Sequence, residues 1–391
     1  PIYSFKTQDF DGDFSFLFAG DPQIGSGDSV DSDAAGWSST LSKATAAFPD
    51  TSFVISAGDQ VDTAEDEEQY EAFLSPSTLK SLAIAVNLGN HEEGDAIYNE
   101  HFNIPNVSEL GASATDGSGD YWYIYNNTLF MSLNSNNTDA GEHKEFMQQV
   151  IDTYGSEVEW KVVTFHHSIY SVANHSDDAD VLQRREEMSP IFSELDIDVV
   201  LMGHDHVYTR TYMMDGTTPI TTDGVTSSVT DPADGEVLYI TGNSSSGSKY
   251  YDIQNVEFPY AAVKNQEKTP NITKIDVTDD SFTITTYRVS DMSVVDSFSI
   301  NRSVASVTDV TVTPGTVSVE QGSTQAFTAT VTGDNDPAQT VTWTVSGNNS
   351  ENTTISDSGI LTVAEDETAE SLTVTATSTV DTTKSGTASV T

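Results

Sequence analysis

The feature that most constrains the fold of this chain is the alternation of short, apolar, β-rich runs with longer amphipathic stretches between residues 14 and 300. Runs typical of buried strands lie at 14–18, 53–55, 82–86, 161–165 and 198–202, and helices are expected at 34–47, 65–80, 141–154 and 180–195. Such alternation predicts an α/β domain with a parallel or mixed sheet. Beyond residue 220 the pattern contains strands alone, at 236–240, 273–277, 281–288 and 294–300, and we expect these to close the same domain.

A second region begins near Ser303, where the composition shifts to Thr, Val, Ser, Gly and Asp. Short alternating runs between turn signals at 310–312, 326–331, 341–345, 360–363 and 372–376 predict an all-β sandwich with Trp343 in its core. The pieces Val310 to Pro314, Thr340 to Val345 and Gly359 to Val363 resemble a bacterial immunoglobulin-like (group 2) domain of the kind found in surface adhesins. The sequence therefore predicts two domains, 1–302 and 303–391.

The net charge of the chain limits the classes of molecule that it can bind. It has 61 acidic residues against 15 lysines and arginines, a formal net charge of −46. The field of such a chain repels nucleic-acid backbones and anionic membranes, so we expect neither as a partner. A site that handles an anionic group here needs local positive charge, for which a metal ion is the obvious source.

Cysteine usage and the start of the chain bear on its location. The absence of cysteine excludes disulfides, thiolate metal ligands and cysteine nucleophiles. No run of about 18 apolar residues is present, so no membrane insertion is expected. Pro1 leads almost at once into the first strand without a signal peptide, which suggests a trimmed chain that has lost a signal and an upstream domain. We expect a bacterial, extracytoplasmic protein that is secreted or held at the cell surface.

Five short motifs occur at or near the predicted strand ends. They are Gly20-Asp21-Pro22-Gln23, Gly58-Asp59-Gln60-Val61-Asp62, Gly89-Asn90-His91-Glu92, His166-His167 and Gly203-His204-Asp205-His206. Each alone is ordinary, because an Asp after a strand is usually a helix cap or a turn residue. Together they supply oxygen and imidazole donors that suit two adjacent metal ions, with one carboxylate able to bridge them. The glycines before Asp59, Asn90 and His204 let the backbone turn sharply close to such ions.

These motifs, with Tyr170 four residues after His166, resemble those of the calcineurin-like metallophosphoesterases, and within them the purple acid phosphatase branch. The resemblance implies an α/β (α+β) sandwich of two mixed β-sheets flanked by helices. It also implies two metal ions of iron, zinc or manganese, with His91 facing the substrate as the catalytic residue. The implied ligands are Asp59 as the bridge, Asp21 and His206 at the first ion, and Asn90, His166 and His204 at the second.

Several positions stay open. His167 could be the metal ligand in place of His166, and if it is not, it would support the neighbouring ligand or face the substrate. His175 falls near a position where related enzymes contact phosphate. Relatives place a His where this chain has Gln23, or a Tyr where it has Asp62, so the usual fourth ligand of the first ion is missing. Gln23, Asp62 or water could fill that place. The serine-rich run 242–248 is compatible with a loop at the rim of the site or with a flexible connection.

The reaction that the resemblance implies is hydrolysis of small phosphate monoesters. A water or hydroxide held by the ions is the expected nucleophile, and His91 would stabilise or protonate the leaving group. A phosphodiesterase can share all of these ligands and is the first alternative. The second is a surface adhesion or binding protein whose metal site has degenerated at Gln23 and Asp62. The immunoglobulin-like domain is expected to serve as a spacer or as an attachment to the cell wall.

Overall fold

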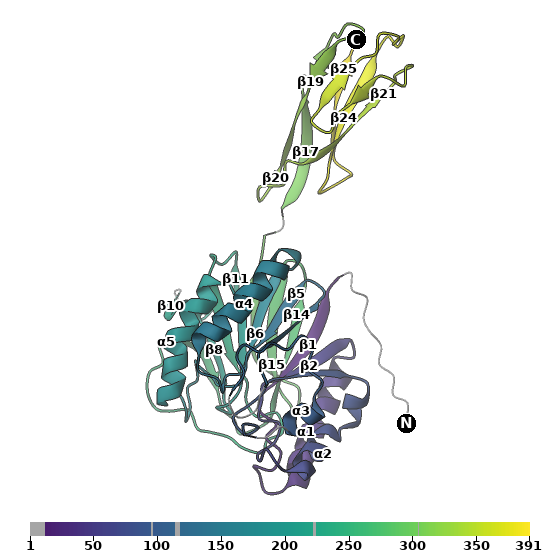
Figure 1. The fold of residues 1–391 in the computed structure, drawn as a ribbon. Coiled ribbons are helices and arrows are strands. Elements are labelled where there is room, and N and C mark those ends of the chain that lie inside the picture. Colours follow the sequence, from purple (N-terminus) through teal and green to yellow (C-terminus); the bar gives the residue numbers. More distant parts are fainter. Residues whose placement is uncertain (1–11, 95–96, 114–117, 222–223, 304) are drawn as a thin grey trace. The chain divides into compact units, whose positions relative to one another are not determined.

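The computed structural model describes residues 12–94, 97–113, 118–221, 224–303 and 305–391 (Figure 1). The chain divides into two compact units, Pro1–Asn301 and Arg302–Thr391. Within the described ranges, none of the helices has the length and apolar character needed to cross a membrane.

The first unit contains two mixed β-sheets. The first sheet has seven strands in the order β11 (Ser228–Thr230), β16 (Val294–Asn301), β15 (Ser281–Arg288), β14 (Asn271–Val277), β1 (Phe14–Ala19), β2 (Thr51–Ser56) and β3 (Ala83–Val86). The second sheet has nine, of which seven follow the order β10 (Thr218–Ile220), β9 (Met213–Asp215), β12 (Glu236–Thr241), β7 (Val199–Met202), β6 (Trp160–Thr164), β5 (Thr128–Ser132) and β4 (Tyr121–Tyr125). The remaining two are β8 (Tyr208–Thr211), which pairs with β12, and β13 (Ala261–Asn265), which pairs with β8. In the first sheet β1, β2 and β3 are parallel, and in the second β5, β6, β7 and β12 are parallel.

The two sheets pack face to face across an aromatic core. Phe16 of β1 stacks on Phe53 of β2 with ring centroids 5.1 Å apart, and it meets Phe130 of β5 edge-on at 5.3 Å. All three side chains are buried. Burial of each stabilises the fold by about 1.5–3 kcal/mol, so this core holds the parallel strands of both sheets in a fixed relation.

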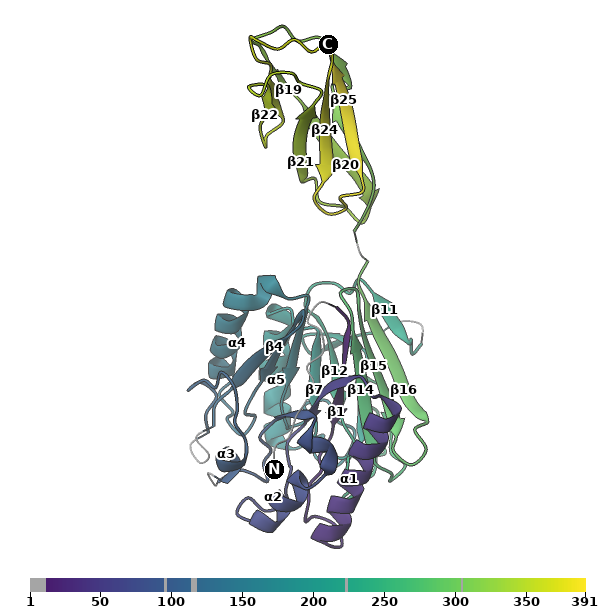
Figure 2. The same cartoon turned by 90° about the vertical axis from the view of Figure 1, so that its right-hand side faces the viewer.

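Helices cover the outer faces of both sheets (Figure 2). Leu17, which points away from the aromatic core because side chains alternate along a strand, shares a buried cluster with Trp37 of α1 (Val30–Ala47) and Phe73 of α2 (Glu67–Leu74). On the second sheet, Val163 shares a cluster with residues of α4 (Ala140–Tyr154) and with Phe192 of α5 (Ala179–Glu194). The short helices are η1 (Ser77–Lys80), α3 (Ile97–His101) and η2 (Gly155–Glu157). The first unit is therefore a sandwich of two mixed sheets flanked by helices, as expected.

Most of the elements expected from the alternation are present. The strands predicted at 14–18, 53–55, 82–86, 161–165 and 198–202 are β1, β2, β3, β6 and β7. The single helix expected over 65–80 is wrong, because α2 ends at Leu74 and η1 begins at Ser77. Pro76 lies between them, and its lack of an N–H and its ring are incompatible with a continuous helix. The hairpin of β4 and β5 was not predicted.

Among the described residues of the second unit, every regular element is a β-strand. β17 (Ser306–Thr313) pairs with β20 (Thr328–Asp334). A four-stranded sheet has the order β18 (Thr316–Val317), β25 (Ser385–Val390), β24 (Leu372–Ser378) and β21 (Val341–Ser346). A three-stranded sheet has the order β19 (Thr324–Ala326), β23 (Ile360–Thr362) and β22 (Thr354–Ile355). The strand expected over 326–331 is interrupted at the buried Phe327. Trp343 is half-buried and packs against the core of this unit. The immunoglobulin-like assignment stays a prediction.

Candidate metal centre

The predicted site residues lie in loops that follow the carboxyl ends of parallel strands. Asp21 follows β1, Asp59 follows β2 and Asn90 follows β3, whereas His166 follows β6 and His204 follows β7. Loops at the carboxyl ends of parallel strands gather at one edge of a sheet. Because the two sheets are packed together, the loops of both contribute to one site.

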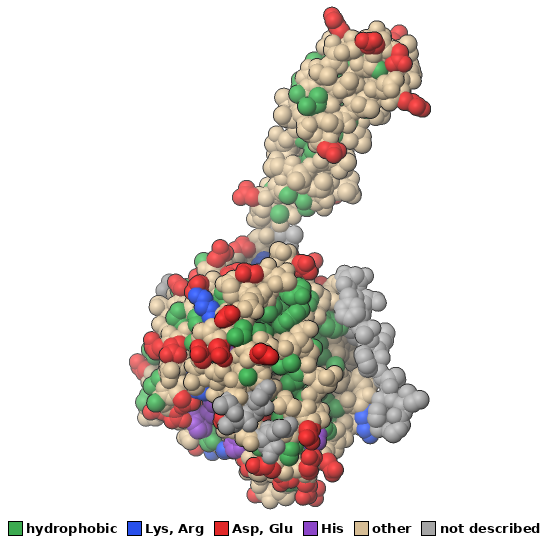
Figure 3. All heavy atoms as spheres, viewed as in Figure 1, with side chains coloured by type: hydrophobic (Ala, Val, Ile, Leu, Met, Phe, Trp, Pro, Cys, Tyr) green, Lys and Arg blue, Asp and Glu red, His purple; other side chains and the backbone are tan. Residues whose placement is uncertain are grey.

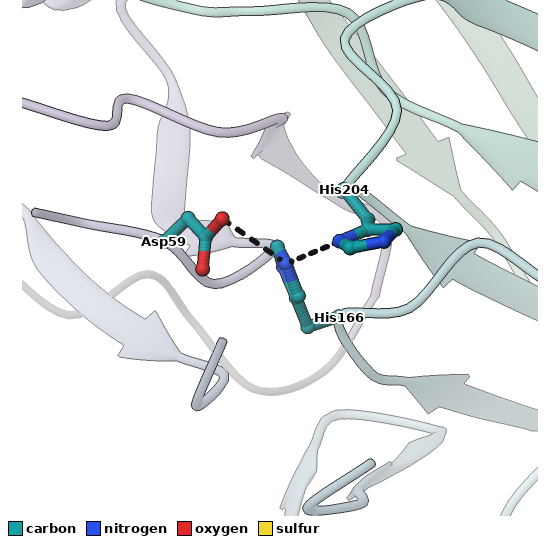
Figure 4. Close-up of side chains that lie close together, drawn as sticks. All are labelled: Asp59, His166 and His204. Carbon is teal, nitrogen blue, oxygen red and sulfur yellow. Dashed lines mark hydrogen bonds and ion pairs between the residues drawn. The ribbon is translucent and has the colours of Figure 1, made fainter. Parts of the chain in front are cut away.

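Asp59, His166 and His204 form a cluster in which one ligand atom of each lies within 4.8 Å of the others (Figure 4). The Nε2 atom of His166 lies 3.3 Å from Asp59 Oδ2, 3.1 Å from His204 Nδ1 and 3.0 Å from Asn90 Oδ1. Its Nδ1 atom lies 3.1 Å from the carbonyl oxygen of Ala57 and donates to it. This outer hydrogen bond fixes the ring so that Nε2 faces the cluster.

A second group of donors surrounds Asp21. His206 Nε2 lies 3.2 Å from Asp21 Oδ2, and the backbone N–H of His204 donates to both carboxylate oxygens at 2.9 Å. His206 Nδ1 lies 3.0 Å from the carbonyl oxygen of Lys249, which can only accept. Nδ1 therefore carries a proton, and the Nε2 lone pair of a neutral His206 faces the carboxylate.

Gln23 offers an oxygen atom without a partner. Its Nε2 donates to Asp62 Oδ1 at 3.1 Å and lies 2.9 Å from His91 Nε2. Its buried Oε1 makes no hydrogen bond with any residue that the structure describes. A buried acceptor left unpaired costs about 1–3 kcal/mol, so this oxygen is available to a cation. The Asp62 side chain, 32% exposed, is instead engaged with Gln23, and of the two residues proposed for the missing ligand Gln23 is the better placed.

His91 lies at the accessible side of Asp59. Its Nδ1 lies 2.6 Å from the carbonyl oxygen of Asp62, and its Nε2 lies 4.0 Å from Asp59 Oδ2. Its backbone N–H donates to Asp59 Oδ1 at 3.0 Å. The side chain is 29% exposed, so a ligand entering the site can reach it.

The two other candidate histidines both lie beside His204 but differ in exposure. The ring of His167 lies 4.7 Å from that of His204, is buried, and has its Nδ1 2.8 Å from Ser135 Oγ. The ring of His175 lies 4.4 Å from that of His204 and is 27% exposed. His167 is therefore placed to support the cluster, and His175 is placed at its accessible rim.

The glycines of the motifs are needed chiefly for space. A Cβ at Gly89 would lie 2.1 Å from Asp59 Oδ1, and one at Gly203 would lie 2.1 Å from Asp21 Oδ1. Gly58 has in addition a φ of +106°, which side chains disfavour. The sharp turn predicted from sequence thus applies to Gly58, whereas the other two admit carboxylates directly against the backbone.

The electrostatics of the cluster favour the metal-binding protonation state at Asp59 and His204, but they hold a proton on His166. Burial alone would raise the pKa of Asp59, but the charges of His166 and His91 outweigh it and hold that pKa well below its usual range. Burial alone would lower the pKa of His166, but Asp59 and Asp21 raise it to about 9. Burial, together with neighbouring histidines, lowers the pKa of His204 well below its usual value. Asp59 is thus ionised and His204 neutral, whereas His166 holds a proton that a metal ion binding at its Nε2 atom would have to displace.

Two acidic residues of the motifs fasten the loops, a role that the sequence analysis missed. Glu92 is buried and accepts the backbone N–H groups of Asp59 at 3.0 Å and Gly89 at 2.9 Å. Burial, followed by the charge of Asp59, raises the pKa of Glu92 to about 8. Asp205 is buried and accepts the Ser171 hydroxyl and the backbone N–H of His175. The only sequence signal was their position inside the motifs.

These residues fit a metal centre. Imidazole nitrogens of His166 and His206 face carboxylates, and the amide oxygen of Gln23 is unpaired. A buried carboxylate that faces an imidazole nitrogen needs a positive charge beside it, either a proton on that nitrogen or a metal ion that takes the place of the proton. The mixture of imidazole and oxygen donors suits zinc, manganese and iron.

Known proteins share this domain. Residues 14–208 match the family described as calcineurin-like phosphoesterase. An uncharacterized protein of Mycobacterium tuberculosis is 28% identical over 179 residues, which cover 39% of this chain and 34% of that protein. Purple acid phosphatase 17 of Arabidopsis thaliana is 33% identical over 100 residues, which cover 25% of this chain and 28% of that protein. The chain therefore spans only about a third of the length of the curated relatives it matches.

A solved structure shares the fold of the first unit. A purple acid phosphatase isolated from yellow lupin (Lupinus luteus) seeds aligns with a TM-score of 0.61 at 13% identity, over 76% of this chain and 54% of that one. At this identity the likeness concerns the fold alone. Together with the family match, it shows that the chain contains a calcineurin-like metallophosphoesterase domain, with purple acid phosphatases among its structural and sequence neighbours.

Proposed function

We propose that the first unit hydrolyses phosphate monoesters at a centre of two metal ions. The observation that carries the proposal is the convergence of imidazole and oxygen donors from five strand-end loops around Asp59 and Asp21. Asp59 would be shared between the ions, with Asp21, His206 and the Gln23 amide oxygen at the first and Asn90, His166 and His204 at the second.

The chemistry divides between the ions and the chain. Such ions supply positive charge that polarises a phosphoryl oxygen and generates a nucleophile from water at neutral pH. The chain holds the donors in place through buried hydrogen bonds, such as that of His166 to Ala57. Asp21 and His206 are almost completely buried, so solvent would screen a positive charge held between them only weakly, and that charge would act strongly on a bound phosphate.

His91 is the residue placed to handle the leaving group. Its Nδ1 donates to the carbonyl oxygen of Asp62, so Nε2 is the atom directed toward Asp59 and the open side of the site. Nε2 accepts from the Gln23 amide nitrogen in this structure, so it can carry a proton to the departing alcohol oxygen, the usual task of a general acid, once that hydrogen bond opens. The exposed part of His175 on the far side of His204 gives a second imidazole within reach of the substrate.

For the second unit we propose an immunoglobulin-like spacer or attachment module. Its support is that all of its regular elements are strands and that Val310, Leu361 and Val374 belong to a core cluster of its own. An extracytoplasmic location, predicted from the sequence, would suit such a module.

The test combines metal content with turnover. The full chain is loaded with zinc, manganese or iron, its metal is measured by mass spectrometry, and hydrolysis of a chromogenic phosphate monoester is compared with that of the matching diester. We expect two ions per chain and faster turnover of the monoester. Asp59→Asn should lose both, whereas Asp309→Asn, which removes an exposed carboxylate of the second unit, should lose neither.

Each other result points to a different function. Two ions with faster turnover of the diester would identify a phosphodiesterase. One ion or none, without turnover of either ester, would contradict an enzymatic role and favour a binding protein with a degenerate metal site.

A further inference from the structure

The serine-rich run 242–248 is a largely buried strap against the turn that carries Asp21, so its interpretation as a flexible connection is wrong. Ser244 and Ser245 are completely buried. The Ser245 hydroxyl donates to the carbonyl oxygen of Gly20 at 2.6 Å, and the Ser248 hydroxyl donates to that of Pro22 at 3.1 Å. The strap is thus fastened to the turn that carries Asp21.

The strap delivers Lys249 and Tyr251 to the edge of the site. The carbonyl oxygen of Lys249 accepts from His206 Nδ1, so its backbone is fixed one hydrogen bond from a ligand nitrogen. The ring of Tyr251 lies 5.4 Å from that of His206 and 5.3 Å from that of His175, and its hydroxyl lies 3.4 Å from His175 Nε2. Lys249 Nζ lies 5.2 Å from the centroid of the Tyr251 ring. Both side chains are half-buried, so they can contact solvent or a ligand.

The ammonium group of Lys249 is held by an aromatic ring and not by a carboxylate. Seven other lysines and arginines form ion pairs with carboxylates, but among the described residues Lys249, like several further cations, forms none. Acidic side chains outnumber basic ones on the visible face of the first unit (Figure 3). The Tyr251 ring, which lies 5.4 Å from the ring of His206, attracts the ammonium group electrostatically without neutralising its charge.

We propose that Lys249, positioned by Tyr251, binds the phosphate group of the substrate and favours monoesters over diesters. This inference rests on the proposed function. A phosphate monoester carries a second negative charge above a pKa of about 6, which a diester lacks. A lysine is a compact point charge on a flexible stem, so it can follow the additional charged oxygen of the monoester. Removing it should therefore weaken monoester binding more than diester binding.

The experiment uses the metal-loaded full chain and inorganic phosphate as the probe. Lys249→Gln should weaken phosphate binding in calorimetry by about tenfold to a hundredfold, the range expected for losing a hydrogen bond to a charged group, with unchanged metal content. Its kcat/KM for a chromogenic monoester should fall by more than that for the matching diester. Lys249→Arg should restore most of both effects.

Lys264→Gln is the matched control, because Lys264 Nζ also lies over an aromatic ring, that of Phe258 at 5.7 Å, and is exposed. It should bind phosphate as the unaltered chain does. The inference is overturned if Lys249→Gln matches this control, or if Lys249→Arg restores nothing. Failure of the unaltered chain to hydrolyse either ester would instead contradict the proposed function, so the two failures are distinguishable.

Discussion

At the scale of single residues, the two hydrogen bonds made by the Gln23 amide nitrogen determine the role of its oxygen. With Nε2 directed to Asp62 and His91, Oε1 is left buried and without a hydrogen-bond partner among the described residues. We expect Gln23→Leu, which keeps the size but removes the oxygen, to lower the affinity for one of the two proposed ions by at least about tenfold. Metal content measured after dialysis against a chelator of known affinity checks this. Gln23→Glu should retain the second ion, and equal retention by Gln23→Leu would show that water fills the place.

His91 is the residue for which metal binding and catalysis separate. It is not part of the cluster of Asp59, His166 and His204, and its side chain is 29% exposed beside Asp59. His91→Ala should therefore keep the metal content and lower turnover by about two to four powers of ten, the usual scale for losing a general acid. Steady-state kinetics and metal analysis of the same sample check both parts. His101→Ala is the control, since His101 pairs with Glu67 on the protein surface. Unchanged turnover in His91→Ala would remove it from the mechanism.

The sequence supports the identity of the site residues better than their geometry. Asp21, Asp59 and Asn90 were proposed because five motifs with oxygen and imidazole donors occur together near strand ends, although each motif alone is ordinary. Which oxygen of Gln23 or Asp62 faces the site depends on χ angles and on partners distant in sequence, which no local pattern encodes. The anchoring role of Glu92 was hidden for the same reason, because its partners are backbone N–H groups of two loops.

At the scale of elements, the loop after β6 depends on one buried carboxylate. Asp205 accepts the Ser171 hydroxyl and the backbone N–H groups of Ala173 and His175, at 3.2 Å and 3.0 Å. Asp205→Ala would leave buried donors unpaired, which costs about 1–3 kcal/mol, and should release this loop locally. Hydrogen exchange over 171–178 should accelerate while β6 stays protected. The control Asp177→Asn, exposed in the same loop, should change nothing, and equal exchange in Asp205→Ala would show that other contacts hold the loop.

The strands that the sequence predicted most clearly are those whose side chains are buried on both faces of the sheet, because they form continuous apolar runs. β1 and β7 are buried throughout, β6 is buried except at Lys161, and amphipathic helices flank all three, so their apolar runs are unambiguous. β4 shows a mixed burial pattern at the edge of its sheet, which leaves no clear alternation to detect. The break between α2 and η1 follows from Pro76, a signal that was present in the sequence and was not used.

At the scale of the whole molecule, the two units have separate cores, which explains why a change in composition near Ser303 was enough to place the boundary close to Asn301. A unit that buries its own apolar cluster unfolds as its own cooperative unit. Two thermal transitions are therefore expected for the full chain, and a buried group confined to one unit should move only one of them.

Glu367 is such a group in the second unit. It is buried, and its carboxylate accepts the backbone N–H of Asn349 at 2.9 Å, the Thr353 hydroxyl at 2.7 Å and the backbone N–H of Ala369 at 2.9 Å. These hydrogen bonds lower the pKa of Glu367 to about 2 from an ordinary value of 4.5. Because the folded pKa is depressed, this stabilisation is present above pH 4.5 and is lost as the pH falls toward 2.

Calorimetry of the full chain at several pH values tests this linkage. Glu367→Gln should lower the Tm of one transition at pH 7 and flatten its dependence on pH between 5 and 2, because the neutral amide cannot titrate and accepts fewer hydrogen bonds. The other transition should keep its position. Glu370→Gln, which removes an exposed carboxyl group nearby, should alter neither. If Glu367→Gln shifted both transitions equally, the two units would unfold as one, and the separate cores would not act independently.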